Sequence, residues 1–130
     1  MPRSRRLGAA AAGLTLGLGA AACGSDDSAS GVSLPATAAE GRQVSIDAGC
    51  AGCHGKDGQG GVGPAWTGLA GSTVSLADGT TVVADDDYLR RSITDPRAQV
   101  PAGYTIVMPT NTLLTPEQID ALVAYINALG

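Results

Sequence analysis

The clearest hydrophobic pattern in the chain lies close to its C-terminus. The segment Thr115–Gln118 supplies a helix N-cap, a proline at the first helical position and a capping-box glutamine. The apolar residues after it recur at helical spacing and share one face: Ile119, Leu122, Val123, Ile126 and Leu129. The pattern predicts a terminal helix that buries this face.

A shorter helix is predicted over about Asp86–Thr94. Leu89 and Ile93 fall on one side of this segment, and Asp95-Pro96 ends it. The acidic run Asp85–Asp87 then lies at the helix start, where its negative charge is favourable with the helix dipole. We expect this run to be solvated surface, and the alternative is a contribution to partner docking.

A β-hairpin is predicted before that helix. Thr73–Ala77 and Thr80–Val83 flank Asp78-Gly79, which is a strong signal for a two-residue hairpin turn. Helix-compatible sequence begins near Thr37, and we place the start of the folded domain there, so that the domain covers residues 37–130.

The apolar mass that these elements can bury is small. The chain has 130 residues, 44% of them apolar and 15% charged, which fits one ordered domain. Aromatic residues make up only 3%, and Phe is absent. Three or four helices with a small hairpin are too little for a robust core at this size. We therefore expect something that the chain does not encode to complete the core.

The N-terminal segment has the pattern of an export signal. Arg3, Arg5 and Arg6 form a basic region, and the next 16 residues, Leu7–Ala22, are uncharged and end in small side chains. A bilayer-spanning helix needs about 20 apolar residues, and this stretch is shorter and diluted by Gly and Ala. We predict that residues 1–22 are a cleaved signal peptide.

The run Ala20-Ala21-Ala22-Cys23 resembles the lipobox of bacterial lipoproteins. The resemblance implies that Cys23 is the lipidated first residue of a protein held on the outer face of the cytoplasmic membrane. Residues 23–36 start with small polar residues and are predicted to be a flexible tether. Two alternatives stay open, an uncleaved membrane anchor and plain secretion with Cys23 as a free thiol.

The charge of the chain is acidic. The formal net charge of −4 argues against a nucleic-acid binder that neutralises phosphates. Without residues 1–22, five basic residues face all twelve acidic ones, so the net charge becomes −7. An acidic domain implies a basic docking patch on its partner.

The residues that carry chemistry are few and lie close together. Cys50-Ala51-Gly52-Cys53-His54 is a CxxCH sequence, the attachment signature of c-type haem. Two thiols at this spacing can add to the two vinyl groups of one porphyrin, and the next residue presents its imidazole to the iron. The alternatives are a structural zinc site, a thioredoxin-like pair and a plain disulfide, and the sequence lacks the further ligands or the strand–helix context that the first two need.

The second axial ligand follows by elimination. The chain has one His and two Met, and Met1 is removed with the signal, so Met108 is the remaining candidate. Met108 precedes Pro109, which favours an extended loop. The alternative is a Met in the core. Ligation by His and Met raises the reduction potential and fills both axial positions, which points to electron transfer.

Taken together, these residues resemble the class I cytochromes c over Thr37–Gly130, with the cytochrome c domain fused to subunit II of bacterial haem-copper oxidases as the closest form. The stretches that carry the resemblance, besides the final helix, are Gly49–His54, Gly61–Pro64, Gly68-Leu69, Asp78-Gly79, Tyr88–Ile93, Asp95-Pro96, Gly103-Tyr104 and Met108-Pro109. The resemblance implies a mostly α fold, with three to four helices around haem and a short β-hairpin. The copper-site cluster and membrane helices of the oxidase subunit have no counterpart in this sequence, which indicates a stand-alone module.

The resemblance also implies a role for individual residues. Cys50 and Cys53 would hold the haem covalently, His54 would be the proximal ligand and Met108 the distal one. The carbonyl of Pro64 would accept the imidazole N–H.

In the terminal helices the resemblance implies that Gly41 allows a close crossing against Tyr125. The sequence departs from the family at Ser45, where an aromatic residue is usual, and at Trp66, where Leu is common.

Three side chains are candidates for the haem propionates because each can donate a hydrogen bond: Trp66, Tyr104 and Arg97. For each of them the alternative is packing or solvated surface.

The sequence therefore predicts a lipid-anchored, single-haem electron carrier and not an enzyme. Its predicted partners are redox proteins, namely a quinol-oxidising complex and a terminal oxidase. The alternative is a haem subunit of a dehydrogenase complex. A third interpretation is an enzyme or a gas sensor, which requires that Met108 does not ligate the iron.

Overall fold

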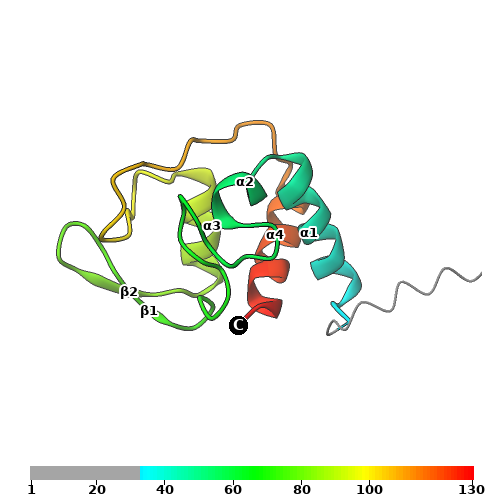
Figure 1. Cartoon of the computed structure of the whole chain (residues 1–130), viewed down its shortest axis with the longest axis horizontal. Coiled ribbons are helices and arrows are strands. Elements are labelled where there is room, and N and C mark those ends of the chain that lie inside the picture. The colour runs from blue at the N-terminus through cyan, green and yellow to red at the C-terminus, as the bar shows by residue number, and fades with distance from the viewer. Residues whose placement is uncertain (1–32) are drawn as a thin grey trace, which may run out of the picture. The chain divides into compact units, whose positions relative to one another are not determined.

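The structure, a computed structural model, describes residues 33–130. Its elements in this range are α1 (Ala36–Asp47), α2 (Ala51–His54), β1 (Thr73–Ser75), β2 (Thr81–Val83), α3 (Asp86–Thr94) and α4 (Pro116–Ala128). The two strands pair antiparallel, so this part of the chain is mostly helical with one small hairpin (Figure 1). This confirms the predicted fold class. The predicted signal peptide and Cys23 lie outside the described residues.

Helix α4 begins with the predicted capping box. The Thr115 hydroxyl accepts a hydrogen bond from the Gln118 backbone N–H, and the Gln118 side chain accepts one from the Thr115 N–H. The predicted apolar face is turned inward, because Leu122, Val123 and Ile126 are buried. The helix therefore starts and packs as the sequence indicates.

Helices α1 and α4 lie side by side and make the most extensive contact between two elements of the described residues (Figure 1). A Cβ added at Gly41 would lie 1.9 Å from the carbonyl oxygen of Ala121 and 2.9 Å from the Cβ of Tyr125. Ser45 is fully buried on the same helix, and its hydroxyl donates to the Arg42 carbonyl at 2.7 Å. The absence of a side chain at Gly41 thus allows the two backbones to approach, and the Ser45 hydroxyl is satisfied within its own helix.

The start of α1 also extends the folded part slightly beyond the predicted boundary. The helix begins at Ala36, one residue before Thr37, and Leu34 packs against the core. The last residues of the segment predicted as a tether therefore belong to the folded unit.

Helix α3 occupies the predicted segment and carries its acidic run at the N-terminus. The Asp85 side chain caps the helix by accepting a hydrogen bond from the Tyr88 N–H at 2.9 Å. Leu89 and Ile93 are buried. Arg90 forms an ion pair with Asp120, and this pair ties α3 to α4.

The hairpin forms where it is predicted, but its turn has three residues instead of two. The Leu76 N–H donates to the Thr80 carbonyl at 2.8 Å, so the loop contains residues 77–79. Gly79 adopts φ +87°, a left-handed conformation that closes such a loop. In this register Val74 pairs with Val82, and both are half-buried. A two-residue turn would instead place Val83 opposite Val74 and turn Val82 outward, so burial of the valine pair sets the register.

The segment after α3 is fastened to the hairpin. The Ala77 N–H donates to the Val100 carbonyl at 2.8 Å, and the Ala102 N–H donates to the Ser75 carbonyl at 2.9 Å. Leu76 also bridges to Pro101. These bonds fix the beginning of the long loop that leads to α4.

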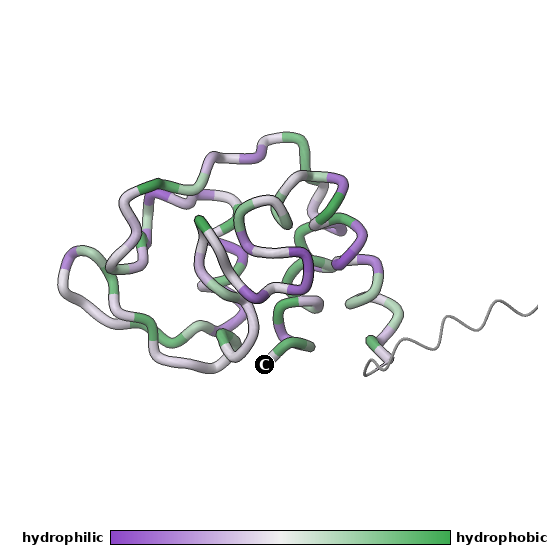
Figure 2. Tube along the Cα trace, in the orientation of Figure 1, coloured by the Kyte–Doolittle hydropathy of each residue, from purple (hydrophilic) through white to green (hydrophobic). Residues whose placement is uncertain are grey.

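The buried residues of these elements form one cluster: Val44, Trp66, Leu76, Ala84, Tyr88, Leu89, Ile93, Leu122, Val123, Tyr125 and Ile126. Figure 2 shows that the apolar positions occur in short stretches separated by polar ones, including stretches in the loop between α3 and α4. Within residues 33–130 no helix is long and apolar enough to cross a membrane.

Replacing Gly41 by alanine should lower the free energy of unfolding by about 1–3 kcal/mol, because the added methyl group cannot fit against the Ala121 carbonyl. Thermal or denaturant unfolding of the purified protein measures the loss. Gly52→Ala in α2 is the matched control, since an added Cβ there meets nothing within 4 Å. Equal unfolding midpoints for Gly41→Ala and the wild type would contradict the close crossing.

Candidate functional site

An apolar cavity of about 360 Å³ lies among α2, β1, α3, α4 and the loop before α4. Its apolar walls include Leu69, Val74, Leu89, Ile93 and Leu122. No Asp, Glu, Lys or Arg side chain is among the described residues that line it. Pockets for cofactors typically span roughly 300–1,000 Å³ and have apolar walls with a few polar groups. The cavity has the character of a cofactor site.

The CxxCH sequence forms one wall of this cavity. Cys50, Cys53 and His54 all line the cavity, because α2 turns them toward it over a single helical turn. Gly55 ends the helix with φ +85°, which sends the chain back along the motif. The returning loop is held by hydrogen bonds from Gly60 N–H to the His54 carbonyl at 2.7 Å and from Gly63 N–H to the Cys53 carbonyl at 2.9 Å.

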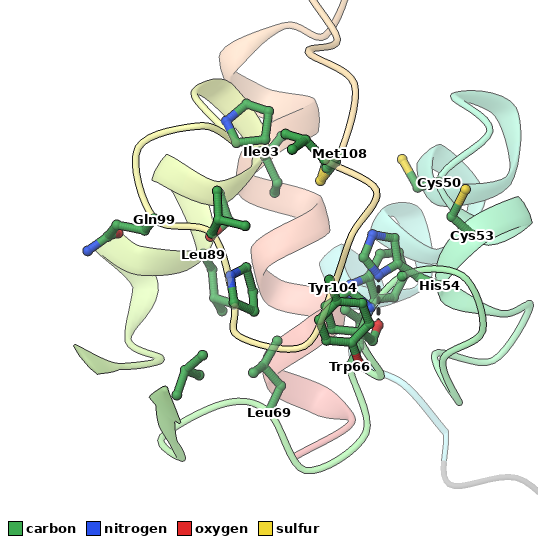
Figure 3. Close-up of a pocket in the computed structure, with 18 of the residues that line it drawn as sticks. Cys50, Cys53, His54, Trp66, Leu69, Leu89, Ile93, Gln99, Tyr104 and Met108 are labelled. Atoms are coloured by element: carbon green, nitrogen blue, oxygen red, sulfur yellow. Dashed lines mark hydrogen bonds between the residues drawn. The ribbon is translucent and has the colours of Figure 1, made fainter. Parts of the chain in front are cut away.

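The His54 ring is held in one orientation. Its Nδ1 lies 2.8 Å from the carbonyl oxygen of Pro64, the contact that the sequence predicts, and the dashed line in Figure 3 marks it. Because a carbonyl only accepts, Nδ1 carries the hydrogen and Nε2 keeps a free lone pair. Burial lowers the pKa of His54, and the Pro64 carbonyl opposes this shift. The neutral imidazole, which is the form that binds a metal, is therefore favoured.

Met108 lines the same cavity from the loop that precedes α4. Its side chain is half-buried, and its sulfur points into the cavity in Figure 3. The structure thus brings all four residues of the predicted haem site to one cavity, although Met108 lies more than fifty residues from His54 in the sequence.

The three side chains predicted to contact the haem propionates lie in different surroundings. Tyr104 lines the cavity, and 38% of its surface is exposed. Trp66 also lines the cavity, but its ring is stacked on His54 with centroids 4.6 Å apart and an interplanar angle of 18°. Arg97 is exposed and is not part of the lining, whereas the preceding residue, Pro96, is buried and lines the cavity. The arginine prediction is not supported by this placement.

Sequence reasoning missed several polar and apolar residues of the lining. Val74 could have been found from the alternation of the hairpin, since it is the inward position of β1. Gln99 lies in irregular backbone and gives no periodic signal. Ser92 has a buried hydroxyl without a hydrogen-bond partner in the described part of the chain. Such an unsatisfied group in a cavity wall is expected where a bound group completes its hydrogen bonding.

The alternatives for the CxxCH sequence fit this geometry poorly. Within residues 33–130 no group of three or more His, Cys, Asp or Glu could hold a metal ion, as a structural zinc would require. Burial raises the pKa of the Cys50 thiol, whereas a thioredoxin-like nucleophile needs a lowered one. Cys50 and Cys53 are both free thiols.

Covalently attached haem fits the residues that are present. The cavity supplies apolar walls, two free thiols, an imidazole with an available Nε2 and one thioether. These are the groups that c-type attachment and axial ligation by His and Met use.

The comparisons with known proteins agree with this geometry. No curated protein matches the sequence. The family model for cytochrome c matches residues 38–130, which is most of the chain. Members of this family bind haem c covalently and typically carry electrons. The chain therefore belongs to the cytochrome c family, as a class I cytochrome c that binds haem c and transfers electrons.

Proposed function

We propose that this protein is a membrane-tethered carrier of single electrons with one haem. The observation that carries the proposal is the shared cavity, which gathers the two thiols of the CxxCH sequence, the imidazole of His54 and the thioether of Met108. When bound, the haem iron supplies a ferric/ferrous couple, and no bond of a substrate is made or broken.

Each residue has a defined task in this function. Cys50 and Cys53 attach the haem through thioether bonds, so the cofactor stays in a domain too small to enclose it. His54 would bind the iron through Nε2, and the Pro64 carbonyl would increase the basicity of the imidazole by accepting the Nδ1 hydrogen. Met108 would supply its thioether as the second ligand of the iron and would thereby exclude small ligands such as oxygen.

The walls of the cavity favour the reduced state. Taking charge out of water is costly, and the ferric centre carries one more positive charge than the ferrous centre. The described lining has no carboxylate that could compensate this charge. Apolar walls and thioether ligation therefore act in the same direction and raise the reduction potential.

The location and the partners are supported by the sequence. Arg3 to Ala22 has the pattern of an export signal, and Cys23 follows a lipobox-like run. A lipidated Cys23 anchors the domain on the outer face of the bacterial cytoplasmic membrane, where the tether lets it move between membrane complexes. The resemblance to the subunit II cytochrome domain supports a route from a quinol-oxidising complex to a terminal haem-copper oxidase.

The double variant Cys50→Ser, Cys53→Ser should fail to fold cooperatively. Without attached haem, the apolar walls of the cavity face water, and a domain of this size has little other core. Circular dichroism during heating tests this, with the protein produced in a host that makes c-type cytochromes. Cys23→Ser, which keeps the CxxCH sequence, is the control. A cooperative melt at the wild-type midpoint in the double variant would refute the dependence on haem.

The Met108→Ala variant should bind carbon monoxide in the ferrous state, whereas the ferrous wild type should not, because the thioether fills the sixth position. Visible spectra before and after exposure to the gas measure the difference. Leu113→Ala, in the same loop, 89% exposed and outside the cavity lining, should behave as the wild type. A colourless wild-type protein, or a pyridine haemochrome without two thioether bonds, would overturn the proposed function.

The mature protein should begin at Cys23 and carry acyl chains on it. Intact-mass and peptide mass spectrometry of the protein from bacterial membranes measures both features. Cys23→Ser should move the protein from the membrane fraction to the soluble fraction or leave it unprocessed. An unmodified Cys23, or a retained segment 1–22, would count against the lipid anchor.

A further inference from the structure

The His54 ring is packed more tightly than ligation alone requires. Its Nδ1 is bonded to the Pro64 carbonyl, and the indole of Trp66 is stacked on it at 4.6 Å. A Cβ at Gly63 would come within 2.9 Å of Cε1, 3.0 Å of Nδ1 and 3.2 Å of Nε2 of the ring. These nearly equal distances place Gly63 over a face of the imidazole and not at its edge. The ring is thus restrained at one nitrogen and by packing against its faces.

Trp66 is itself held by the terminal helices. Its indole meets the ring of Tyr125 edge-on, with centroids 6.0 Å apart and an interplanar angle of 83°. Tyr125 is 1% exposed and lies where α4 crosses Gly41. The Trp66 backbone N–H also donates to the Gly58 carbonyl at 2.7 Å. Only 6% of the Trp66 surface is exposed, so the residue is buried between His54 and Tyr125.

We propose that Trp66 is a positioning residue that sets the orientation of the His54 imidazole plane relative to the haem. This role rests on the proposed ligation of the iron by His54. A flat aromatic ring in parallel contact favours one plane of its neighbour. Leu, the common residue at this position in the family that the sequence resembles, would fill the same space without selecting a plane. The hydrogen bond to Pro64 restrains one atom, and the stacked indole restrains the tilt of the whole ring.

The orientation of an axial imidazole can be measured in the ferric protein. In low-spin ferric haem the plane of the axial ligands decides which pyrrole rings carry most unpaired spin density. The four haem methyl groups therefore give proton resonances whose order and spread report that plane. This signal is independent of electron-transfer activity, and a general loss of stability does not change it.

The test compares haem-loaded ferric variants by proton NMR. Trp66→Leu should change the order or the spread of the methyl resonances, and Trp66→Phe, which keeps a flat ring, should restore the wild-type pattern. Trp66→Met is a second aliphatic variant with the same expectation, in case Trp66→Leu does not accumulate. Val44→Ala, a buried core change outside the cavity, should lower the melting midpoint and keep the wild-type pattern.

Two failures can be told apart by this experiment. Absence of attached haem in the wild type would overturn the proposed function. Attached haem with a wild-type methyl pattern in Trp66→Leu or Trp66→Met would overturn only the positioning role, as would a Trp66→Phe variant that matches the aliphatic ones.

Discussion

The fold depends on apolar side chains that face a cavity which the chain does not fill by itself. Leu89 and Ile93 of α3, Val74 of β1, and Leu122 and Ile126 of α4 all contribute to its walls. Since apolar surface gains stability only when it leaves water, these walls stabilise the fold when the haem covers them. Binding of the cofactor and folding are therefore parts of one process, and covalent attachment at Cys50 and Cys53 keeps the bound state populated.

A continuous set of contacts connects the ligand to the terminal helices. His54 stacks on Trp66, Trp66 packs against Tyr125, and Tyr125 lies at the crossing that Gly41 permits. Packed interiors transmit small displacements because they contain little free space. The geometry of the metal ligand and the contact between the two ends of the folded domain are thus coupled.

Some local features could be predicted because neighbouring residues decide them. The capping box at Thr115 and the bounds of α3 depend on contacts within one helical turn, and both are as predicted. The predicted hairpin turn was wrong by one residue. Burial of the pair Val74–Val82 and the hydrogen bond that Ala77 donates to the Val100 carbonyl overrode the preference of Asp78-Gly79 for a two-residue turn. The preference of two residues for a turn type stabilises a hairpin less than a strand register that buries two valines.

The sequence by itself determined the chemistry of the site. The chain has one CxxCH sequence and a single Met after it, so few sets of haem ligands are possible. The identity of the ligands follows from residue type and spacing alone. Only the tertiary structure decided the surroundings of that site. It turned Arg97 to solvent and placed Trp66 flat against His54. It also buried the Ser92 hydroxyl in the cavity wall, where no group of residues 33–130 forms a hydrogen bond with it. These outcomes depend on contacts between segments far apart in the chain, and no local pattern of polar and apolar residues specifies which faces will meet.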